Sequence, residues 1–454
     1  MLFKFFIIII SLSPLFFGSN RVWSWSLYSS LIACLGAVYF YTVLTADKKQ
    51  ALSLTFIKIP LLLISITLLW IYLQTVTWLP ASWLHPFWQL TANHLNTEVA
   101  ASISISPANT IEALMRLISY CLVFFLSFQF SRQSKNASFI FNSVAYVGTL
   151  YALYGLIAFW GDYKSLFGFE KLHYLGNVSS TFVNRNSYAT YAGLGILASF
   201  PLLISRLQRS LKYGIQNNYG LQYFIENVIV RAGLPLLMIF IISTALLLSH
   251  SRGGFLSSLF AIIIFLILPI IAKKVKVGKI SIMLLMIVTF TTAALWSSGD
   301  KLLERMDQIT LTADKNGRLA VYELLEQQIA ENPWLGMGYG SFEKSFRLYR
   351  NETVKGYYTM AHNTYLENMF ELGVLPAGCL FLALFYIGLQ CLRGVWQRQQ
   401  HWYYPAIGCC ATLLVGAHAL VDFSLQIPAV AYTYALLMGA ALAQSLPRSQ
   451  RLSS

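Results

Sequence analysis

The chain has 454 residues, of which 57% are hydrophobic and 15% aromatic, whereas Asp, Glu, Lys and Arg together supply only 11%. Soluble domains carry roughly 25% charged residues, so this composition excludes a soluble multidomain protein and indicates a polytopic membrane protein. The net charge of +14 comes from basic residues spread among apolar runs, a pattern that reflects membrane topology and not a nucleic-acid partner.

A helix that crosses a bilayer needs about 20 mostly apolar residues. The sequence contains about 12 such stretches, and we therefore predict an all-α membrane protein that forms a single polytopic membrane domain over residues 1–454. The first stretch resembles a signal peptide, but Phe16 and Phe17 replace the small residues of a cleavage site, so we expect a retained helix. The predicted spans are Leu2–Phe17, Leu27–Leu44, Ile57–Trp78, Ile111–Phe130, Phe139–Trp160, Tyr188–Ile204, Leu234–Leu248, Phe255–Ile271, Ile280–Trp296, Leu375–Leu392, Tyr404–Val421 and Ala429–Leu446.

The distribution of charge predicts the orientation of these spans. If both termini are cytoplasmic, the inner gaps are basic and contain only two acids, Asp47 and Glu226. The lysine cluster at residues 273–279 is the strongest single marker, because Lys and Arg concentrate in cytoplasmic loops. Two long gaps then lie on the outer side: residues 79–110, and a larger loop over residues 297–373, between spans 9 and 10, where we expect the chemistry.

The first long gap begins with an aromatic cluster that includes Trp83, Phe87 and Trp88. Aromatic rings of this kind lie at the level of the lipid headgroups. We expect an interfacial extracytoplasmic helix on the membrane surface, with a binding role for His85 as the alternative.

Two arginines stand at the outer ends of apolar helices. Arg185 lies between Asn184 and Asn186 just before the sixth span, and Arg252 lies in the short turn Ser249–Gly254 between spans seven and eight. An arginine in such a place is costly unless it faces a cavity or an anion, and its planar guanidinium suits a diphosphate. Arginines whose side chains extend to lipid headgroups are the alternative.

The large outer loop is expected to be helical, as a catalytic loop built from short helices. Arg318 and Tyr322, four residues apart, share one helical face, and Asn332-Pro333 ends that helix. The glycine-rich segment 336–341 superficially resembles a phosphate-binding loop, but no strand precedes it and no Lys follows at the required offset. We expect a tight turn there instead.

At the end of this loop, His362 is placed to act as a base near neutral pH at the outer mouth of a membrane helix. Asn363 is expected to cap the following helix, and Glu367 lies one turn further along the same face. A purely structural His362 is the alternative. His418 and Asp422, four apart at the outer end of span eleven, are expected to pair and fix a local bend.

Arg185, Arg252, Arg318 and His362 therefore come from different outer segments at similar membrane depth. Four cationic or ionisable groups at one face favour an anionic, membrane-embedded substrate, and a lipid-linked diphosphate fits this description better than a soluble metabolite.

Five segments of the chain, in this order, resemble the O-antigen ligase and polymerase superfamily of bacterial envelope glycosyltransferases. The resemblance extends from about residue 180 to the end of the chain. It rests on the segments at residues 182–189, 249–254, Arg318 with 332–338, 362–367, and 418–423 with Pro428.

The resemblance implies a metal-independent, inverting glycosyltransferase without a cofactor, in the bacterial inner membrane with its active site facing the periplasm. Its donor would be a glycan linked to undecaprenyl diphosphate. Arg252 and Arg318 would hold the diphosphate with Arg185, and His362 would orient or deprotonate the acceptor hydroxyl. No Asp-x-Asp pair in the outer loops offers a site for a divalent metal.

The acceptor is left open by these residues. An O-antigen ligase, which uses lipid A core, is favoured slightly over a polymerase that joins lipid-linked repeats; a third branch glycosylates Ser or Thr of proteins. A transporter of lipid-linked sugars belongs to a different class, and we find neither internal repeats nor ionisable residues at mid-membrane to support it.

Overall fold

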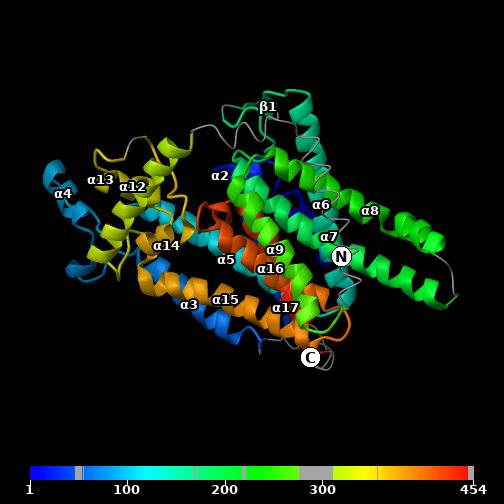
Figure 1. Ribbon diagram of the computed structural model, residues 1–454. Coiled ribbons are helices and arrows are strands. Elements are labelled where there is room, and N and C mark those ends of the chain that lie inside the picture. The colour runs from blue at the N-terminus through cyan, green and yellow to red at the C-terminus, as the bar shows by residue number, and fades with distance from the viewer. Residues whose placement is uncertain are drawn as a thin grey trace.

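The computed structural model describes residues 1–45, 54, 56–166, 169–171, 173–216, 221–275, 310–354 and 356–447. These residues form a bundle of long helices, with a group of shorter helices at one end (Figure 1). The elements of the first half are α1 Leu2–Leu12, η1 Phe17–Ser19, α2 Val22–Thr45, α3 Lys58–Leu73, η2 Ala81–Trp83, α4 Pro86–Leu95, α5 Pro107–Phe130, α6 Ser134–Trp160, β1 Ser165–Leu166, β2 Phe169–Glu170 and α7 Arg185–Gln216. Those of the second half are α8 Leu221–Leu248, α9 Arg252–Ile271, α12 Thr310–Glu331, α13 Phe342–Tyr349, α14 Thr364–Leu372, α15 Val374–Gln397, α16 Tyr403–His418, η3 Ser424–Gln426 and α17 Pro428–Ser445.

Most of the predicted spans coincide with helices. Eleven of them lie on α1, α2, α3, α5, α6, α7, α8, α9, α15, α16 and α17, and the ninth, Ile280–Trp296, lies outside the described residues. Among the described residues, seven helices are long and apolar enough to cross a membrane: α2, α5, α6, α9, α15, and parts of α7 and α8. The α1 and α3 helices are apolar but shorter. The chain is thus a multi-pass, helical membrane protein, and the count of twelve spans stays a prediction.

The centre of the bundle is α17, whose residues are all buried. It packs against α5, α6, α7, α15 and α16, and small residues allow this close contact. A side chain at Gly439 would stand 2.4 Å from the backbone oxygen of Phe124 in α5. The turn before α17 is therefore anchored to the best-packed part of the molecule.

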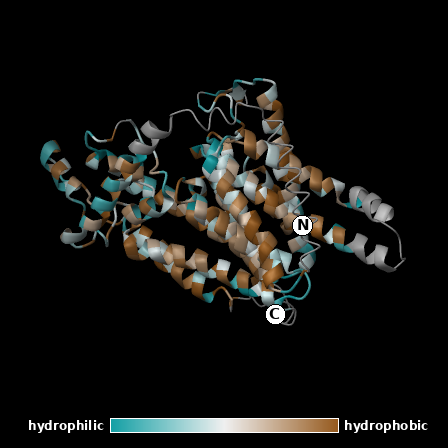
Figure 2. Ribbon diagram, in the orientation of Figure 1, coloured by the Kyte–Doolittle hydropathy of each residue, from teal (hydrophilic) through white to brown (hydrophobic). Residues whose placement is uncertain are grey.

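The two long outer gaps fold together into one outer unit, which comprises α4, α12, α13 and α14 (Figure 1). Its apolar core includes Ile105 from the first gap and Val321, Phe342 and Phe370 from the second. Polar residues are more frequent in its helices than in the bundle, which is dominated by apolar ones (Figure 2). The expected loops at 79–110 and 297–373 thus form a packed layer where they are described.

The first gap is tied to this unit by His85. Its Nδ1 accepts a hydrogen bond from the backbone N–H of Phe87 and caps α4, and its Nε2 lies 2.9 Å from the hydroxyl of Tyr349 in α13. Burial lowers the pKa of His85 to about 4, so the ring is neutral. These contacts give His85 a structural role, in place of the alternative of ligand binding.

One feature of the fold departs from the all-α prediction. Strands β1 and β2 form a short antiparallel hairpin between α6 and α7, with Ser165 opposite Glu170 and Leu166 opposite Phe169. Strands of two residues carry no detectable period-2 pattern, which is why the sequence did not indicate them.

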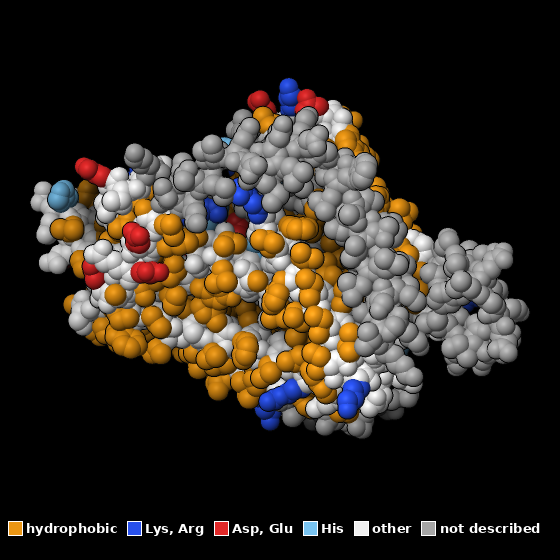
Figure 3. All heavy atoms as spheres, in the orientation of Figure 1, with side chains coloured by type: hydrophobic (Ala, Val, Ile, Leu, Met, Phe, Trp, Pro, Cys, Tyr) orange, Lys and Arg blue, Asp and Glu red, His pale blue; other side chains and the backbone are white. Residues whose placement is uncertain are grey.

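Charged side chains lie at the two ends of the molecule, and the surface between them is largely hydrophobic (Figure 3). On the face shown, Asp and Glu side chains lie over the outer unit, whereas the charged side chains visible among the described residues at the opposite end of the bundle are Lys and Arg. The orientation of these two ends relative to the membrane stays a prediction from the loop charges.

Candidate functional site

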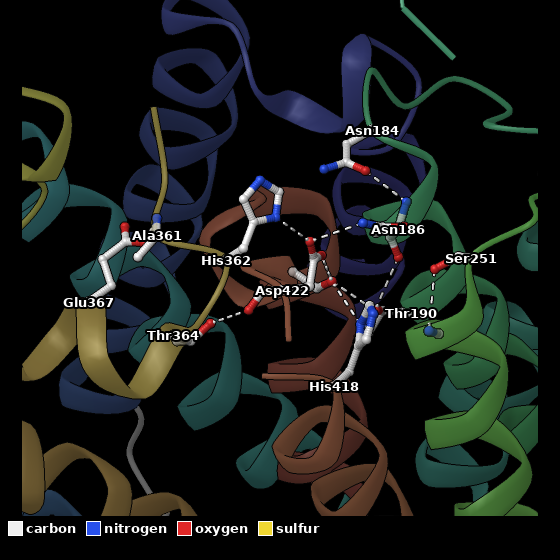
Figure 4. Close-up of polar contacts among 12 residues, drawn as sticks. Asn184, Asn186, Thr190, Ser251, Ala361, His362, Thr364, Glu367, His418 and Asp422 are labelled. Atoms are coloured by element: carbon white, nitrogen blue, oxygen red, sulfur yellow. Dashed lines mark hydrogen bonds and ion pairs between the residues drawn. The ribbon is translucent and has the colours of Figure 1, made fainter. Parts of the chain in front are cut away.

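The functional candidate His362 faces a carboxylate that the sequence had paired with another histidine. The Nδ1 atom of His362 lies 3.3 Å from Oδ1 of Asp422, and the His362 side chain is 19% exposed (Figure 4). The ring of Phe423 packs edge-on against the imidazole. No described residue forms a hydrogen bond with Nε2 of His362. The imidazole is therefore oriented through one nitrogen, while the other is available to a substrate.

The carboxyl group of Asp422 is buried and ionised. Burial alone would raise its pKa, but the hydrogen bond with His362 and the charges of His418 and His362 outweigh burial, and the pKa lies below its ordinary value. The side-chain amide of Asn186 donates to Oδ1 over 3.2 Å, and the hydroxyl of Ser424 donates to Oδ2 over 2.9 Å. A buried carboxylate with these donors can hold the His362 tautomer in which Nδ1 carries the proton.

The expected pair between His418 and Asp422 is wrong as a direct contact. Nδ1 of His418 lies 2.5 Å from the hydroxyl of Thr190 and 3.1 Å from that of Ser424, and Ser424 connects the two residues. The physical reason is that α16 ends at His418. Residues four apart share a face only within a helix, and beyond His418 the chain turns, which carries Asp422 towards His362.

The backbone around His362 is held in an unusual conformation. Its φ angle is 56°, in the left-handed region that is uncommon for a residue other than glycine. The Asn363 side chain caps α14 by accepting from the backbone N–H groups of Tyr365 and Leu366, as predicted. The Tyr322 hydroxyl donates to the backbone oxygen of His362 over 2.8 Å. His362 is thus fixed from both sides by other elements.

The start of α7 reaches the site through Asn186 and carries Arg185. One guanidinium nitrogen of Arg185 donates to Oδ1 of Asn177 over 2.9 Å, and the guanidinium lies over the ring of Tyr174. The same Asn177 oxygen is 2.9 Å from Nδ1 of His250. Asn177 therefore connects the Arg185 segment with the turn that precedes Arg252, and no pattern in the sequence had indicated it.

The start of α9 lies against the same turn. The Ser251 hydroxyl caps the helix by accepting from the N–H of Gly254. A side chain at Gly253 would stand 3.1 Å from the ring of His418, and one at Gly254 would stand 2.4 Å from the side chain of Ala189. Both glycines are thus required by close packing. Arg252 is exposed, and its side chain has no hydrogen bond or ion pair with a described residue.

The third arginine, Arg318, is half-buried in α12, one turn before Tyr322. The contacts of Tyr322 with His362, of Asn186 with Asp422 and of Gly253 with His418 place the segments of all four candidates around one turn of the chain, residues 418–424. Lys and Arg side chains are visible between the outer unit and the top of the bundle in Figure 3. We find no direct contact between His362 and a candidate arginine in the described part of the chain.

The glycine-rich segment 336–341 is a structural turn, as expected. The backbone N–H of Gly338 donates to the carbonyl oxygen of Glu371, and the N–H of Tyr339 donates to the side chain of Gln74. Gly338 has a φ of 101°, and a side chain there would stand 2.1 Å from the hydroxyl of Ser104. These backbone donors are occupied, so they do not form a phosphate-binding loop.

An apolar cavity of about 520 Å³ lies beside the site, between α3, α5, α15, α16 and α17. The described residues that line it include no charged side chain. Its lining includes the polar side chains of Thr364, Asn368 and Gln426, and the Thr364 hydroxyl donates to the backbone oxygen of Asp422. Thr364 therefore connects the lining of this cavity with the His362–Asp422 pair.

Metal ligands do not gather in the described ranges, which contain no group of three His, Cys, Asp or Glu residues suited to a metal ion. The side chains that donate to Asp422 besides His362 are the amide of Asn186 and the hydroxyl of Ser424, and Thr190 contacts Ser424. The sequence pattern had indicated the two amides beside Arg185, whereas no pattern had indicated Thr190 or Ser424.

The comparison with known proteins bears on the segment that contains three of the four candidates. Residues 237–382 match the family model described as O-antigen ligase, and this range includes Arg252, Arg318 and His362. A search of curated proteins finds no match to the chain. This match supports the resemblance seen in the sequence: over residues 237–382 the chain is similar to the O-antigen ligase family.

Proposed function

We propose that the protein is an inverting, metal-independent glycosyltransferase of the outer face of the bacterial inner membrane. It would move a glycan from an undecaprenyl-diphosphate carrier to an acceptor hydroxyl. The observation that carries the proposal is the His362 imidazole, which faces the buried Asp422 carboxylate through Nδ1 and has Nε2 open to a substrate.

In the proposed reaction, Nε2 of His362 accepts the proton of the acceptor hydroxyl as its oxygen attacks the anomeric carbon of the donor sugar. The bond between that carbon and the diphosphate oxygen breaks, and its electron pair leaves with the lipid diphosphate. Asp422 stabilises the imidazolium that forms, because a carboxylate facing Nδ1–H interacts more strongly with the charged ring. Attack opposite to the leaving group inverts the anomeric configuration.

The leaving group requires positive charge. Breaking the bond concentrates negative charge on the lipid diphosphate, and fixed guanidinium groups lower the energy of that state. Arg252 is the strongest candidate, because it is exposed at the start of a helix and has no described partner. Arg318 lies one turn from the residue that contacts His362, and Arg185 is oriented by Asn177.

The apolar cavity supports a lipid-linked substrate. Its volume of about 520 Å³ and its uncharged, mostly apolar lining suit part of a hydrocarbon chain. Thr364 lines this cavity, and its hydroxyl bonds to the backbone oxygen of Asp422. A lipid carrier could therefore present its head near the His362–Asp422 pair.

For the acceptor, we propose lipid A core, which makes the protein an O-antigen ligase. Polymerisation of lipid-linked repeats is the alternative within the superfamily, followed by transfer to Ser or Thr of a protein. A transporter of lipid-linked sugars would form no new bond. A ligase and a polymerase differ in their products, so one set of reactions separates these two.

The test uses the purified protein in proteoliposomes with a lipid-diphosphate-linked glycan. Lipid A core and a second lipid-linked repeat are offered in separate reactions, and products are separated by gel electrophoresis and mass spectrometry. Glycan attached to lipid A core supports the ligase, whereas a ladder of longer lipid-linked chains supports the polymerase. Absence of a new glycosidic bond in both reactions would contradict the proposed ligase.

A further inference from the structure

Glu367 joins the two chain segments that carry His362 and Asp422. Its Oε2 accepts a hydrogen bond of 2.6 Å from the backbone N–H of Ala361, the residue before His362 (Figure 4). Its Oε1 accepts a hydrogen bond of 2.8 Å from the side-chain amide of Gln426, in the turn that follows Asp422. One side chain therefore bridges the two segments whose separation sets the His362–Asp422 distance.

The surroundings of Glu367 favour its neutral form. The side chain is only 2% exposed, and its ionisable neighbours are acidic: Glu371 on the next turn of α14, and Asp422. Burial and these two carboxylates raise its pKa well above the ordinary range. No described cation forms an ion pair with it. A buried carboxyl group without a cation is much cheaper to keep protonated than ionised.

The amide of Gln426 fits a protonated partner. Its Oε1 atom is buried without a hydrogen bond in the described part of the chain. The two ends of an amide are interchangeable in shape, and their assignment follows from the hydrogen bonds. With the amide turned over, the Glu367 hydroxyl donates to the Gln426 oxygen and the other Glu367 oxygen still accepts from Ala361, so a protonated Glu367 keeps both of its hydrogen bonds.

We propose that Glu367 is a positioning residue: a neutral carboxylic acid that fixes the Ala361–His362 peptide against the turn at Gln426 and so holds the His362 imidazole on Asp422. The inference rests on the proposed function in one respect, that His362 is the base. The backbone of His362 itself requires such a residue. Its φ of 56° lies in the left-handed region, and a conformation of this kind persists only where neighbouring contacts enforce it.

The first test compares Glu367→Gln with Glu367→Leu in the proteoliposome reaction. Glutamine can accept from Ala361 and donate to Gln426, so Glu367→Gln should keep at least half of the wild-type kcat. Leucine offers neither bond, so Glu367→Leu should lower kcat by roughly tenfold or more while KM for the donor changes less than about twofold, since a misplaced base slows chemistry without removing donor contacts. Glu331→Gln and Glu331→Leu, at an exposed glutamate of α12, are the matched controls.

Should Glu367→Leu fail to fold, Gln426→Leu takes its place. This substitution removes one of the two bonds of Glu367 and leaves the bond with Ala361 intact. It should lower kcat in the same direction, by a smaller factor and with the same unchanged KM. Wild-type kcat in both leucine variants would overturn the proposal, and so would a Glu367→Gln enzyme as slow as Glu367→Leu, because that result requires an ionised Glu367.

A second readout does not depend on activity. Diethyl pyrocarbonate modifies unprotonated imidazole nitrogens, and mass spectrometry follows the modification of His362, with the exposed His94 in the same sample as reference. Wild type and Glu367→Gln should give the same rate at His362 relative to His94, whereas Glu367→Leu should change it at least threefold. Equal rates of His362 modification in all three proteins would overturn the positioning role of Glu367. A wild-type protein that forms no glycosidic bond contradicts the proposed function alone, since these rates still test Glu367.

Discussion

The two nitrogens of His362 have different surroundings, and this difference is the basis of the proposed chemistry. Nδ1 faces the ionised Asp422, which also accepts from Asn186 and Ser424, while Nε2 has no described partner. A histidine held in this way has a defined tautomer and a defined direction for proton transfer. If His362 had a purely structural role, its Nε2 atom would have no function in a reaction.

Asp422→Asn tests the contribution of that carboxylate. Asparagine keeps the size and can still accept one hydrogen bond, but it cannot stabilise an imidazolium by charge. We expect kcat to fall by about 10²-fold, within the range typical of general-base catalysis. Initial rates in proteoliposomes check this, with Asp162→Asn, at an exposed aspartate, as the control. A kcat equal to wild type would mean that Asp422 only shapes the turn.

The arginines are tested by substitution with lysine. Arg252→Lys and Arg318→Lys keep one positive charge but lose the planar fork that matches two phosphate oxygens. We expect kcat/KM to fall by roughly 10-fold or more in each, with normal abundance of the protein in the membrane. Arg347→Lys, at an exposed arginine of α13, should be unchanged. Full activity of either variant would remove that arginine from the proposed diphosphate site.

The sequence predicted the candidate residues of the site more often than the residues that contact them. Asn363 was predicted as the cap of the helix that follows His362, because local spacing reports helix faces and caps. The pairing of Asp422 with His362 was not, because it joins segments 60 positions apart in the chain. Asn177 and Ser424 were missed for the same reason: their importance comes from tertiary contacts alone.

At the scale of elements, the short helix α14 connects the site with the rest of the outer unit. Glu371, one turn after Glu367, accepts from the backbone N–H of Phe342 at the start of α13. Its backbone oxygen accepts from Met337 and Gly338 in the glycine-rich segment, and also from Gln74. These bonds fix α13 and the glycine-rich segment to the helix that His362 precedes.

Glu371 should make the stability of the protein depend on pH. Burial is the largest cause that raises its pKa, from 4.5 to about 7. A raised pKa contributes stability that is full below the unfolded value and lost as pH rises through the folded value, so this contribution is lost as pH rises from 4.5 to about 7. The melting temperature in detergent should therefore be higher at pH 5 than at pH 8.

Glu371→Gln provides the comparison for this effect. Glutamine can still accept from Phe342 but does not titrate, so the difference in melting temperature between pH 5 and pH 8 should shrink. Glu367 has a raised pKa as well and should leave part of the dependence in place. An identical pH dependence in wild type and Glu371→Gln would show that Glu371 does not titrate in this range.

Long helices were well predicted by apolar length alone, since a membrane span requires an uninterrupted apolar run and leaves few alternatives. The end of α12 at Glu331, just before Asn332-Pro333, was also predicted, because proline cannot continue a helix. The packing of α4 against α13 through His85 and Tyr349 was not, since no local pattern records which distant loop covers another.

At the scale of the whole molecule, a bundle of apolar helices supports an outer unit, and the candidate site lies where the two meet. The His362 segment comes from the outer unit, Asp422 from the turn between α16 and α17, and Asn186 from the start of α7. The apolar cavity opens among the bundle helices beside this junction. The arrangement suits a reaction between a lipid-linked donor and an acceptor outside the bilayer.

The central claim is that this chain itself forms a glycosidic bond with His362 as the base. The most direct measurement is single-turnover transfer by purified wild type, His362→Ala and the control His94→Ala in proteoliposomes loaded with lipid-diphosphate-linked glycan. We predict an inverted glycosidic product from wild type and His94→Ala, and at least about a 10²-fold slower reaction from His362→Ala at equal abundance. Equal rates from wild type and His362→Ala would contradict the account.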